Sequence, residues 1–329
     1  MIRVPRPSRR DGFILIVVLG MVLLLSALLF AFSRTTRASL QIAESFRESA
    51  QAMTCARAGL GLAIAAVAEV NDLASDRRLD DLRTGEKTFP VGEGHCAVTI
   101  TEESGRLNVN ALQGEDGRPN RQRIDQMLRL IDLLNRRKEA TERIGYGIVP
   151  AVIDWIDADD EPTLLPFVES AGQGVESSYY ENRDPPYRCR NAPMDTIEEL
   201  RWIKGISAET FAPLRDLLTT AGSDRINLNA APKLVLESLS EQMDPALAQM
   251  IVQRRQLKPF ETVAELREVP GMTDNIYQAL RNAVEVRPEE AYYRIRSRGQ
   301  VKDRTREIEA LLHRNPQTGN VDVILYRES

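Results

Sequence analysis

An uncharged apolar run near the start of the chain constrains the fold more than any other feature. Phe13 to Phe32 spans twenty residues without a charged side chain. A helix rises about 1.5 Å per residue, so this run is about 30 Å long and matches the hydrocarbon core of a bilayer. No second run of this length follows among the 329 residues. The sequence therefore predicts one membrane-spanning helix and excludes a polytopic membrane protein.

The residues that flank this run predict its orientation. The first twelve residues contain four arginines and one aspartate, whereas Arg34 and Arg37 follow the run. Because the more basic flank of a membrane helix stays in the cytoplasm, we expect the N-terminus there. The rest of the chain is then exported, and its 28% of charged residues suits a globular domain outside the membrane.

Three fates of this segment are compatible with the residues. A secretory signal peptide is cut after its apolar core at a small-x-small site, but this run is long for a signal core and no tidy site follows it. An uncleaved anchor would keep the whole segment. In the third alternative, which we favour, the chain is cut between Gly12 and Phe13. The segment before this bond is basic and ends in glycine, and an aromatic residue and an apolar run follow it. This pattern resembles a type IV prepilin leader.

The fifth position of such a mature chain departs from the usual pattern. Most pilin-like proteins carry glutamate there, whereas this chain has Val17 if Phe13 is the first mature residue. A carboxylate inside a bilayer is costly and is kept only for a use, which in these proteins is attraction to the amino group of the neighbouring subunit. A subunit without it is expected to join a filament differently from the others.

An amphipathic pattern without proline continues beyond the apolar run, from 33 to 70. Residues 13–70 are therefore predicted to form one helix, roughly 87 Å long at the standard rise. A helix broken near Ser33 is the alternative. The small residues between Ala56 and Ala63 suit close packing of the second half of the helix against a sheet.

Strand-like alternation occurs at both ends of the remaining chain. The expected strands are His95–Thr101, Gly105–Asn110, Ala291–Ser297, Arg304–Leu312 and Val321–Tyr326. We expect these ends, 33–111 and 289–329, to form one small antiparallel sheet under the long helix. An all-helical domain is predicted as an insertion at 112–288, which is physically inexpensive because domain termini commonly lie close together.

Two similar units lie in the predicted insertion. Leu200–Leu218 and Leu266–Val284 each contain a helix, a turn with glycine and a second helix, which indicates helix-hairpin-helix or SAM-like units. Ser207 and Thr273 are expected to be the N-caps of the second helices. Trp202 of the first unit is expected to be a core anchor.

Several segments together resemble one known family. Besides the leader and Val17, they are EESGRLNVNA (102–111), VIDWIDADDEP (152–162), SSYYENRDPPYRCRNAP (177–193), TIEELRWIKGI (196–206) and RINLNAAPKLVLESL (225–239). Their order and spacing are similar to those of the minor pseudopilin K of the type II secretion system, the GspK family. That family also lacks the fifth-position glutamate. The resemblance implies an α+β pseudopilin fold, in which a long helix packs on a sheet that carries a large helical insertion.

The resemblance also implies a structural role, with no catalysis. Similar proteins cap the tip of a periplasmic pseudopilus with the minor pseudopilins I and J, above the major pseudopilin, and promote its assembly for export of folded proteins across the outer membrane. The prepilin peptidase would remove residues 1–12 and methylate Phe13. The chain would then reside in the inner membrane, with its C-terminal domain in the periplasm.

An acidic cluster stands out within the predicted insertion. Its five carboxylates lie within eight residues: Asp154, Asp157, Asp159, Asp160 and Glu161. Oxygen ligands gathered on a loop suit Ca²⁺, although the glycine of an EF-hand loop is missing. A solvated helix end is the alternative, in which the acids oppose the helix dipole.

The family resemblance favours calcium, because family members bind it in this region. The implied ligands are Asp157, Asp159, Asp160 and Glu176. Family members often have Gly-Ala-Glu-Asp near the last of these, whereas this chain has Ser177 in place of the final acid. That difference weakens the case for a second ion more than the case for the first.

The three cysteines, Cys55, Cys96 and Cys189, allow one disulfide in the periplasm and leave at least one thiol. Cys55 and Cys96 meet if the helix packs on the first strand. The residues do not choose among the three pairings, and three free thiols are the alternative.

Two other functions compete with a structural role. Helix-hairpin-helix units also occur in membrane-anchored competence proteins that bind DNA, but the net charge of −5 and the acids around the second unit oppose phosphate binding. We therefore expect no nucleic-acid partner. An enzyme is not expected, because the sequence lacks a nucleophile-elbow, zinc or phosphate-loop motif and has only His95 and His313 as histidines.

Overall fold

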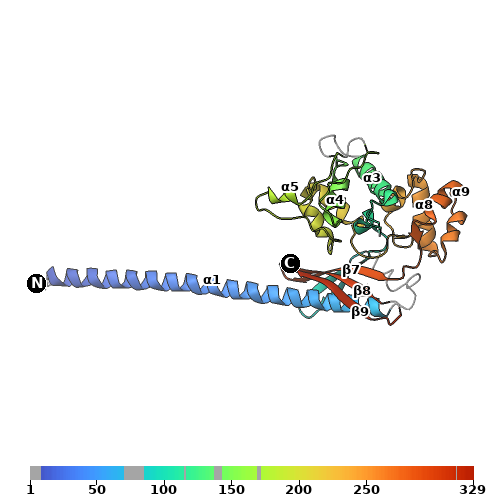
Figure 1. The fold of residues 1–329 in the computed structure, drawn as a ribbon. Helices are drawn as coiled ribbons and strands as arrows, with labels where there is room; N and C mark the ends of the chain where they lie inside the picture. The colour runs from blue at the N-terminus through green and yellow to red at the C-terminus, as the bar shows by residue number, and fades with distance from the viewer. Residues whose placement is uncertain (1–8, 70–84, 115, 137–142, 169–171, 316) are drawn as a thin grey trace, which may run out of the picture.

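The computed structural model describes the chain apart from residues 1–8, 70–84, 115, 137–142, 169–171 and 316. A single long helix, α1 (Arg9–Ala68), dominates its shape (Figure 1). The helix is unbroken at Ser33, so the prediction of one continuous helix is confirmed over the described residues. Within them it is the one helix long and apolar enough to cross a membrane. The apolar residues from Phe13 onward lie exposed along its outer half.

Five antiparallel strands form the sheet in the order β1-β2-β7-β8-β9. They are β1 (Lys87–Val91), β2 (Gly94–Glu102), β7 (Ala291–Val301), β8 (Arg304–Arg314) and β9 (Val321–Glu328). The expected strands from both ends of the chain thus meet where β2 pairs with β7. The edge strand β1 was not predicted, because five residues with Pro90 among them give a weak strand pattern.

The inner half of α1 packs on one face of this sheet. Cys55, Ala56 and Ala63 are buried in a core shared with β2, β7 and β8. Glycines allow the close approach: a Cβ at Gly59 would collide with Ser297, and one at Gly299 would collide with the backbone of α1. The small residues of the helix therefore serve the packing that was expected of them.

The chain leaves the sheet after Glu102 and returns at Ala291, so residues 103–290, here called the insert, lie between β2 and β7. The insert covers the face of the sheet opposite α1 (Figure 1). It begins earlier than the expected residue 112. Leu107, Val109 and Leu112 belong to its own hydrophobic core and not to the core under α1.

Helices and short strands alternate in the insert. They are β3 (Leu107–Asn108), η1 (Val109–Leu112), α3 (Arg121–Asn135), α4 (Ile148–Ile156), α5 (Ser177–Glu181), η3 (Ile197–Trp202), α6 (Ala208–Arg215), β4 (Leu218–Thr219), β5 (Ile226–Asn227), α7 (Lys233–Ser238), α8 (Pro245–Leu257), η4 (Val263–Glu268), α9 (Asp274–Leu280) and β6 (Val284–Glu285). The sequence predicts an all-helical insert, and this prediction is wrong. The insert also contains the parallel strand pairs β3–β4 and β5–β6. The strand predicted at Gly105–Asn110 shortens to β3 and pairs inside the insert.

These two strand pairs reveal an internal repeat. Arg-Leu-Asn-Val-Asn-Ala (106–111) in the first repeat (106–220) corresponds to Arg-Ile-Asn-Leu-Asn-Ala (225–230) in the second repeat (225–286). Each repeat opens with a strand and closes with its parallel partner. The expected helix pairs, η3–α6 and η4–α9, precede the closing strands. The predicted N-caps are confirmed, since Ser207 accepts a hydrogen bond from Thr210 N and Thr273 accepts one from Ile276 N.

Candidate functional site

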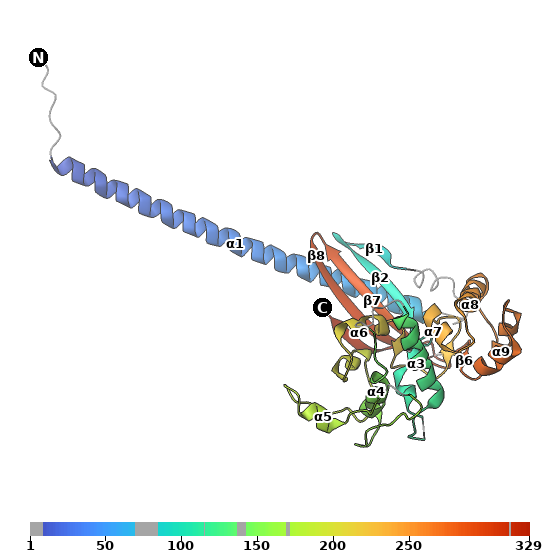
Figure 2. The ribbon, with the colours of Figure 1, turned by 90° about the horizontal axis from the view of Figure 1, so that it is seen from above.

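The acidic cluster lies in the first repeat, at the end of α4. Asp154 belongs to the last turn of this helix, and Asp157 is its C-terminal cap. Glu176 comes from the following loop and directly precedes α5. Figure 2 shows α4 and α5 on the side of the insert away from α8 and α9, so the cluster is a property of the first repeat alone.

Three carboxylates converge in this cluster. One oxygen each of Asp154, Asp157 and Glu176 lies within 4.8 Å of the others, and the three residues are 0%, 5% and 4% exposed. Thr163 N donates to Asp154 Oδ1 at 2.8 Å. The other Asp154 oxygen, Oδ1 of Asp157 and both oxygens of Glu176 are buried without a hydrogen-bond partner. Gly174 allows this crowding, because a Cβ there would collide with the Asp154 carboxylate.

Burial makes the charged form of these side chains costly. Burial first, and then the neighbouring carboxylates, raise the pKa of Glu176 to about 8 and that of Asp157 to about 7. Burial also raises the pKa of Asp154. A divalent cation would offset this cost, because carboxylate oxygens are ligands that hard cations prefer. The unpartnered buried oxygens therefore fit a calcium ion.

The implied ligand set agrees with this cluster only in part. Asp157 and Glu176 are brought together, whereas Asp159 and Asp160 are exposed and lie outside the group of three. Asp159 Oδ1 accepts a hydrogen bond from the backbone of Glu161, and Asp160 Oδ1 accepts one from Asn191. Asp154 was missed as a candidate ligand, although its spacing of three from Asp157 placed both on one side of a helix end.

An aromatic cluster connects this loop to η3. Trp155 and Tyr180 pack edge to face at 5.3 Å, and Tyr187 lies 5.4 Å from Trp202. Tyr187 Oη donates to the backbone oxygen of Trp202 at 2.7 Å. Trp155 is buried, but Trp202 is 56% exposed, so the expectation that Trp202 is a core anchor is wrong. Trp202 packs against the solvent-exposed edge of the aromatic cluster.

Other candidate residues lie away from this cluster. Gly12 lies within α1, and Phe13 is exposed on it. Most of the leader lies outside the described residues, so cleavage at this pair stays a prediction. Cys55, Cys96 and Cys189 are buried free thiols in the structure.

The two repeats coincide with two known sequence families. A family model described as type II secretion system protein K, first part, matches residues 105–222, and a second model of that description matches 226–287. Together they cover more than half of the chain.

Curated relatives carry the same description. Type II secretion system protein K of Pectobacterium carotovorum is 28% identical over 240 residues, which are 70% of this chain and 69% of that protein. The protein of the same description from Aeromonas hydrophila is 25% identical over 238 residues, 68% of each chain.

A solved structure has the same fold. It is a chain of the GspK-GspI-GspJ complex from the type II secretion system of enterotoxigenic Escherichia coli, with a TM-score of 0.62 and 23% identity. The match covers 89% of this chain and 99% of that one. These comparisons give no support to the alternative of a membrane-anchored DNA-binding protein. The matched families, relatives and fold together show that this chain belongs to the protein K family of the type II secretion system, a family of minor pseudopilins.

Proposed function

We propose that this minor pseudopilin caps the tip of the periplasmic pseudopilus together with the minor pseudopilins I and J. In this position it would promote assembly of the major pseudopilin beneath it and so support export of folded proteins across the outer membrane. The observation that carries the proposal is the three-layer arrangement, with α1 on one face of the sheet and the insert on the other (Figure 1). A subunit with so large an insert suits the end of a filament. Its role is then structural and not catalytic.

The absent carboxylate at Val17 supports the same position. A pilin-like subunit uses the glutamate of that position to attract the amino group of a neighbour, and a terminal subunit has no such need. We infer that the chain is anchored in the inner membrane with a cytoplasmic N-terminus, because the basic residues precede the apolar run.

Processing tests this proposal directly. Co-expression with a prepilin peptidase should remove residues 1–12 and add one methyl group to Phe13, which the intact mass of the membrane-extracted chain measures. Gly12→Leu should leave the chain unprocessed. A wild-type chain that keeps its leader under these conditions would instead be an ordinary membrane anchor.

A flank of α1 beside β8 and β9 is the surface we assign to I and J. Phe46 is 73% exposed and Ile42 is 58% exposed, although both lie beyond the apolar run. Phe46 also lines a groove of about 380 Å³ with Met53 and Arg306. Burial of such exposed apolar side chains is the main favourable term in association.

Co-purification with I and J tests this surface. Ile42→Asp and Phe46→Asp should each reduce recovery of the complex, because a charge would have to be buried against the partner helix. Thr36→Asp adds the same charge to another side of α1 and is the matched control. Equal recovery of all three variants would place the partners elsewhere.

We propose that Asp154, Asp157 and Glu176 hold a calcium ion. The support is their unpartnered buried oxygens and the electrostatic cost of three carboxylates in one place. When bound, the ion supplies a positive charge that cross-links α4 to the loop before α5. Chelation should therefore increase protease cleavage within residues 157–190.

Calorimetric titration with calcium distinguishes the two ligand sets. Asp154→Asn and Glu176→Gln should abolish binding if the three buried carboxylates form the site. Asp159→Asn and Asp160→Asn should leave the affinity within about threefold, as expected of exposed carboxylates that bind no ion. The reverse pattern would restore the set that the sequence implied, and equal titrations of all variants would remove the site.

We also infer that η3–α6 and η4–α9 are helix-hairpin-helix-type units that serve packing within the insert. Gly205 and Gly271 occupy equivalent turns with φ of 85° and 90°, a region that glycine adopts readily. Leu200 and Leu266 of the two units are fully buried in the core of the insert. A salt-sensitive shift of duplex DNA by the full chain would contradict a purely structural use.

A further inference from the structure

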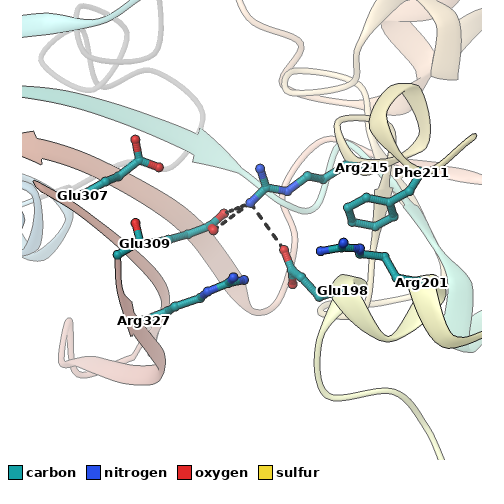
Figure 3. Close-up of a pocket in the computed structure, with 8 residues that line it drawn as sticks. Glu198, Arg201, Phe211, Arg215, Glu307, Glu309 and Arg327 are labelled. Carbon is teal, nitrogen blue, oxygen red and sulfur yellow. Dashed lines mark hydrogen bonds and ion pairs between the residues drawn. The ribbon is translucent and has the colours of Figure 1, made fainter. Parts of the chain in front are cut away.

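A charged cavity of about 230 Å³ lies at the seam between the insert and the sheet. Its charged residues are Glu198 and Arg201 of η3, Arg215 of α6, Glu307 and Glu309 of β8 and Arg327 of β9. Figure 3 shows them facing one hollow from both sides of the seam. Neither the membrane anchor nor the acidic cluster involves any of these side chains.

The glutamates of this cavity already have arginine partners. Glu309 lies 2.6 Å from Arg215, and the same guanidinium is 3.4 Å from Glu198. Glu307 lies 3.3 Å from Arg298 on the neighbouring strand. The negative charges of the wall are therefore compensated from within the chain.

Arg201 and Arg327 differ from the other arginines of the wall. Both are exposed, and neither has an ion-pair partner among the residues that the structure describes. Their guanidinium groups point into the hollow from opposite walls, Arg201 from the insert and Arg327 from the sheet (Figure 3). Arg201 also lies 5.9 Å from the centre of the Phe211 ring. Neither of these two guanidinium groups forms an ion pair within the described residues, although glutamates line the same cavity, so both can bind a carboxylate from outside.

We propose that Arg201 and Arg327 together bind a carboxylate side chain of a partner protein. A guanidinium presents parallel N–H donors that match the two oxygens of a carboxylate. Trp202, the next residue of η3, does not line the cavity; it packs on Tyr187 and is 56% exposed. Tryptophan and arginine are the residues most enriched where protein partners bind tightly. A polypeptide that places an acidic side chain between the two arginines can also cover this exposed tryptophan with another residue, whereas a free anion uses only the arginines.

Such binding would connect two parts of the fold. Arg201 belongs to the first repeat of the insert and Arg327 to the last strand of the sheet. One carboxylate between them adds a link across the seam beside the pair of Arg215 and Glu309. The partner would therefore hold the insert on the sheet as well as bind it.

The test measures binding of a fluorescein-labelled peptide of six glutamates to the full chain in non-ionic detergent at low salt. Fluorescence anisotropy should show saturable binding, and Arg201→Gln with Arg327→Gln should weaken it at least tenfold. The matched control is Arg281→Gln, which removes an exposed arginine from the end of α9 and should change the affinity by less than twofold. Arg201→Lys with Arg327→Lys keeps the charge but loses the forks and should give an intermediate loss.

Hydrogen exchange should show that the bound peptide protects residues 197–202 and 321–328 together. No saturable binding to the wild type, or equal binding to the double glutamine variant, would overturn the proposal. Inorganic phosphate that displaces the peptide at equal concentration would also overturn it, because the site would then accept any oxyanion. Loss of binding in Arg281→Gln as well would show only general attraction to a basic surface.

Discussion

The two repeats of the insert close in the same way over very different lengths of chain. In the first, Asn110 Nδ2 donates to the backbone oxygens of Met194 and Thr220, and its Oδ1 accepts from Met194 N. In the second, Asn229 makes the equivalent three bonds to Phe260 and Val286. The first closure spans 84 residues and the second 31.

The difference in length between the two closures shows that closing a loop and holding a metal ion are separate roles. Loop-closure entropy grows slowly with length, so the longer first closure costs only about 1 kcal/mol more. Length alone therefore creates no need for a metal in the first repeat. The need arises from Asp154, Asp157 and Glu176, which the longer segment buries together and which the second repeat lacks at its shorter closure. Both repeats are closed by the same asparagine hydrogen bonds, and the first also contains the buried carboxylates at which we propose a calcium ion.

Among substitutions, the largest effect is expected from those that remove the asparagine hydrogen bonds closing each repeat. Asn110→Ala and Asn229→Ala should each lower the free energy of unfolding by about 2–4 kcal/mol. Each substitution removes three hydrogen bonds and leaves backbone groups without a partner. Urea unfolding measures both. Losses that differ by more than about 2 kcal/mol would show that the two asparagines are not equivalent.

Removal of calcium should affect the first repeat alone. At a free calcium concentration of a hundred times Kd, the ion stabilises the fold by about 2.7 kcal/mol. Chelation should remove this stabilisation and speed hydrogen exchange around α4 and α5, while exchange around α8 and α9 stays unchanged. Faster exchange in both repeats would contradict the assignment of the ion to the first.

The pH dependence of the calcium-free protein should be opposite to that of an ordinary paired carboxylate. Because Glu176 and Asp157 have folded pKa values of about 8 and about 7, the folded state binds more protons than the unfolded state between pH 5 and 8. The stability of the calcium-free protein should therefore fall by several kcal/mol as the pH rises through this range. Thermal unfolding in chelator at pH 5 and pH 8.5 checks this. Glu176→Gln should reduce the dependence of stability on pH.

The smallest effect concerns the helix caps that the repeats share. Ser207→Ala and Thr273→Ala should each cost about 1 kcal/mol, because each leaves one backbone donor of a first helical turn without its acceptor. The two losses should agree within about 0.5 kcal/mol, as thermal unfolding of the two variants measures. A negligible loss for one cap alone would show that its helix is held by packing.

Local patterns in the sequence predicted the local structure well. Periodicity identified α1, alternation identified β7, β8 and β9, and the caps at Ser207 and Thr273 followed from residue preference. The strand β1 was missed, because a short edge strand with a proline has no clear alternation. The insert was expected to begin at 112, because the pattern of Gly105–Asn110 fits a strand in either sheet, and only tertiary pairing decides which.

Features that join distant residues could not be derived from such patterns. Glu176 meets Asp154 and Asp157 only because the loop folds back over α4, while Asp159 and Asp160 turn outward although they are nearer in sequence. The repeated Asn-x-Asn-Ala at 108–111 and 227–230 is a sequence signal of the internal repeat. It contains the two asparagines whose hydrogen bonds close the repeats. These two copies are short and lie at different intervals from their helix pairs, so only the parallel strand pairs reveal them as a repeat.

The packing of α1 on the sheet has a mechanical consequence. Backbone of the helix lies so close to Gly299, and Gly59 so close to Ser297, that little space is left for the helix to shift against the sheet at these two points. This close packing favours transfer of a load from the membrane end of the helix to the strands of the sheet. Displacement of the anchor along its axis would carry the sheet, and the insert fixed to it, by the same distance.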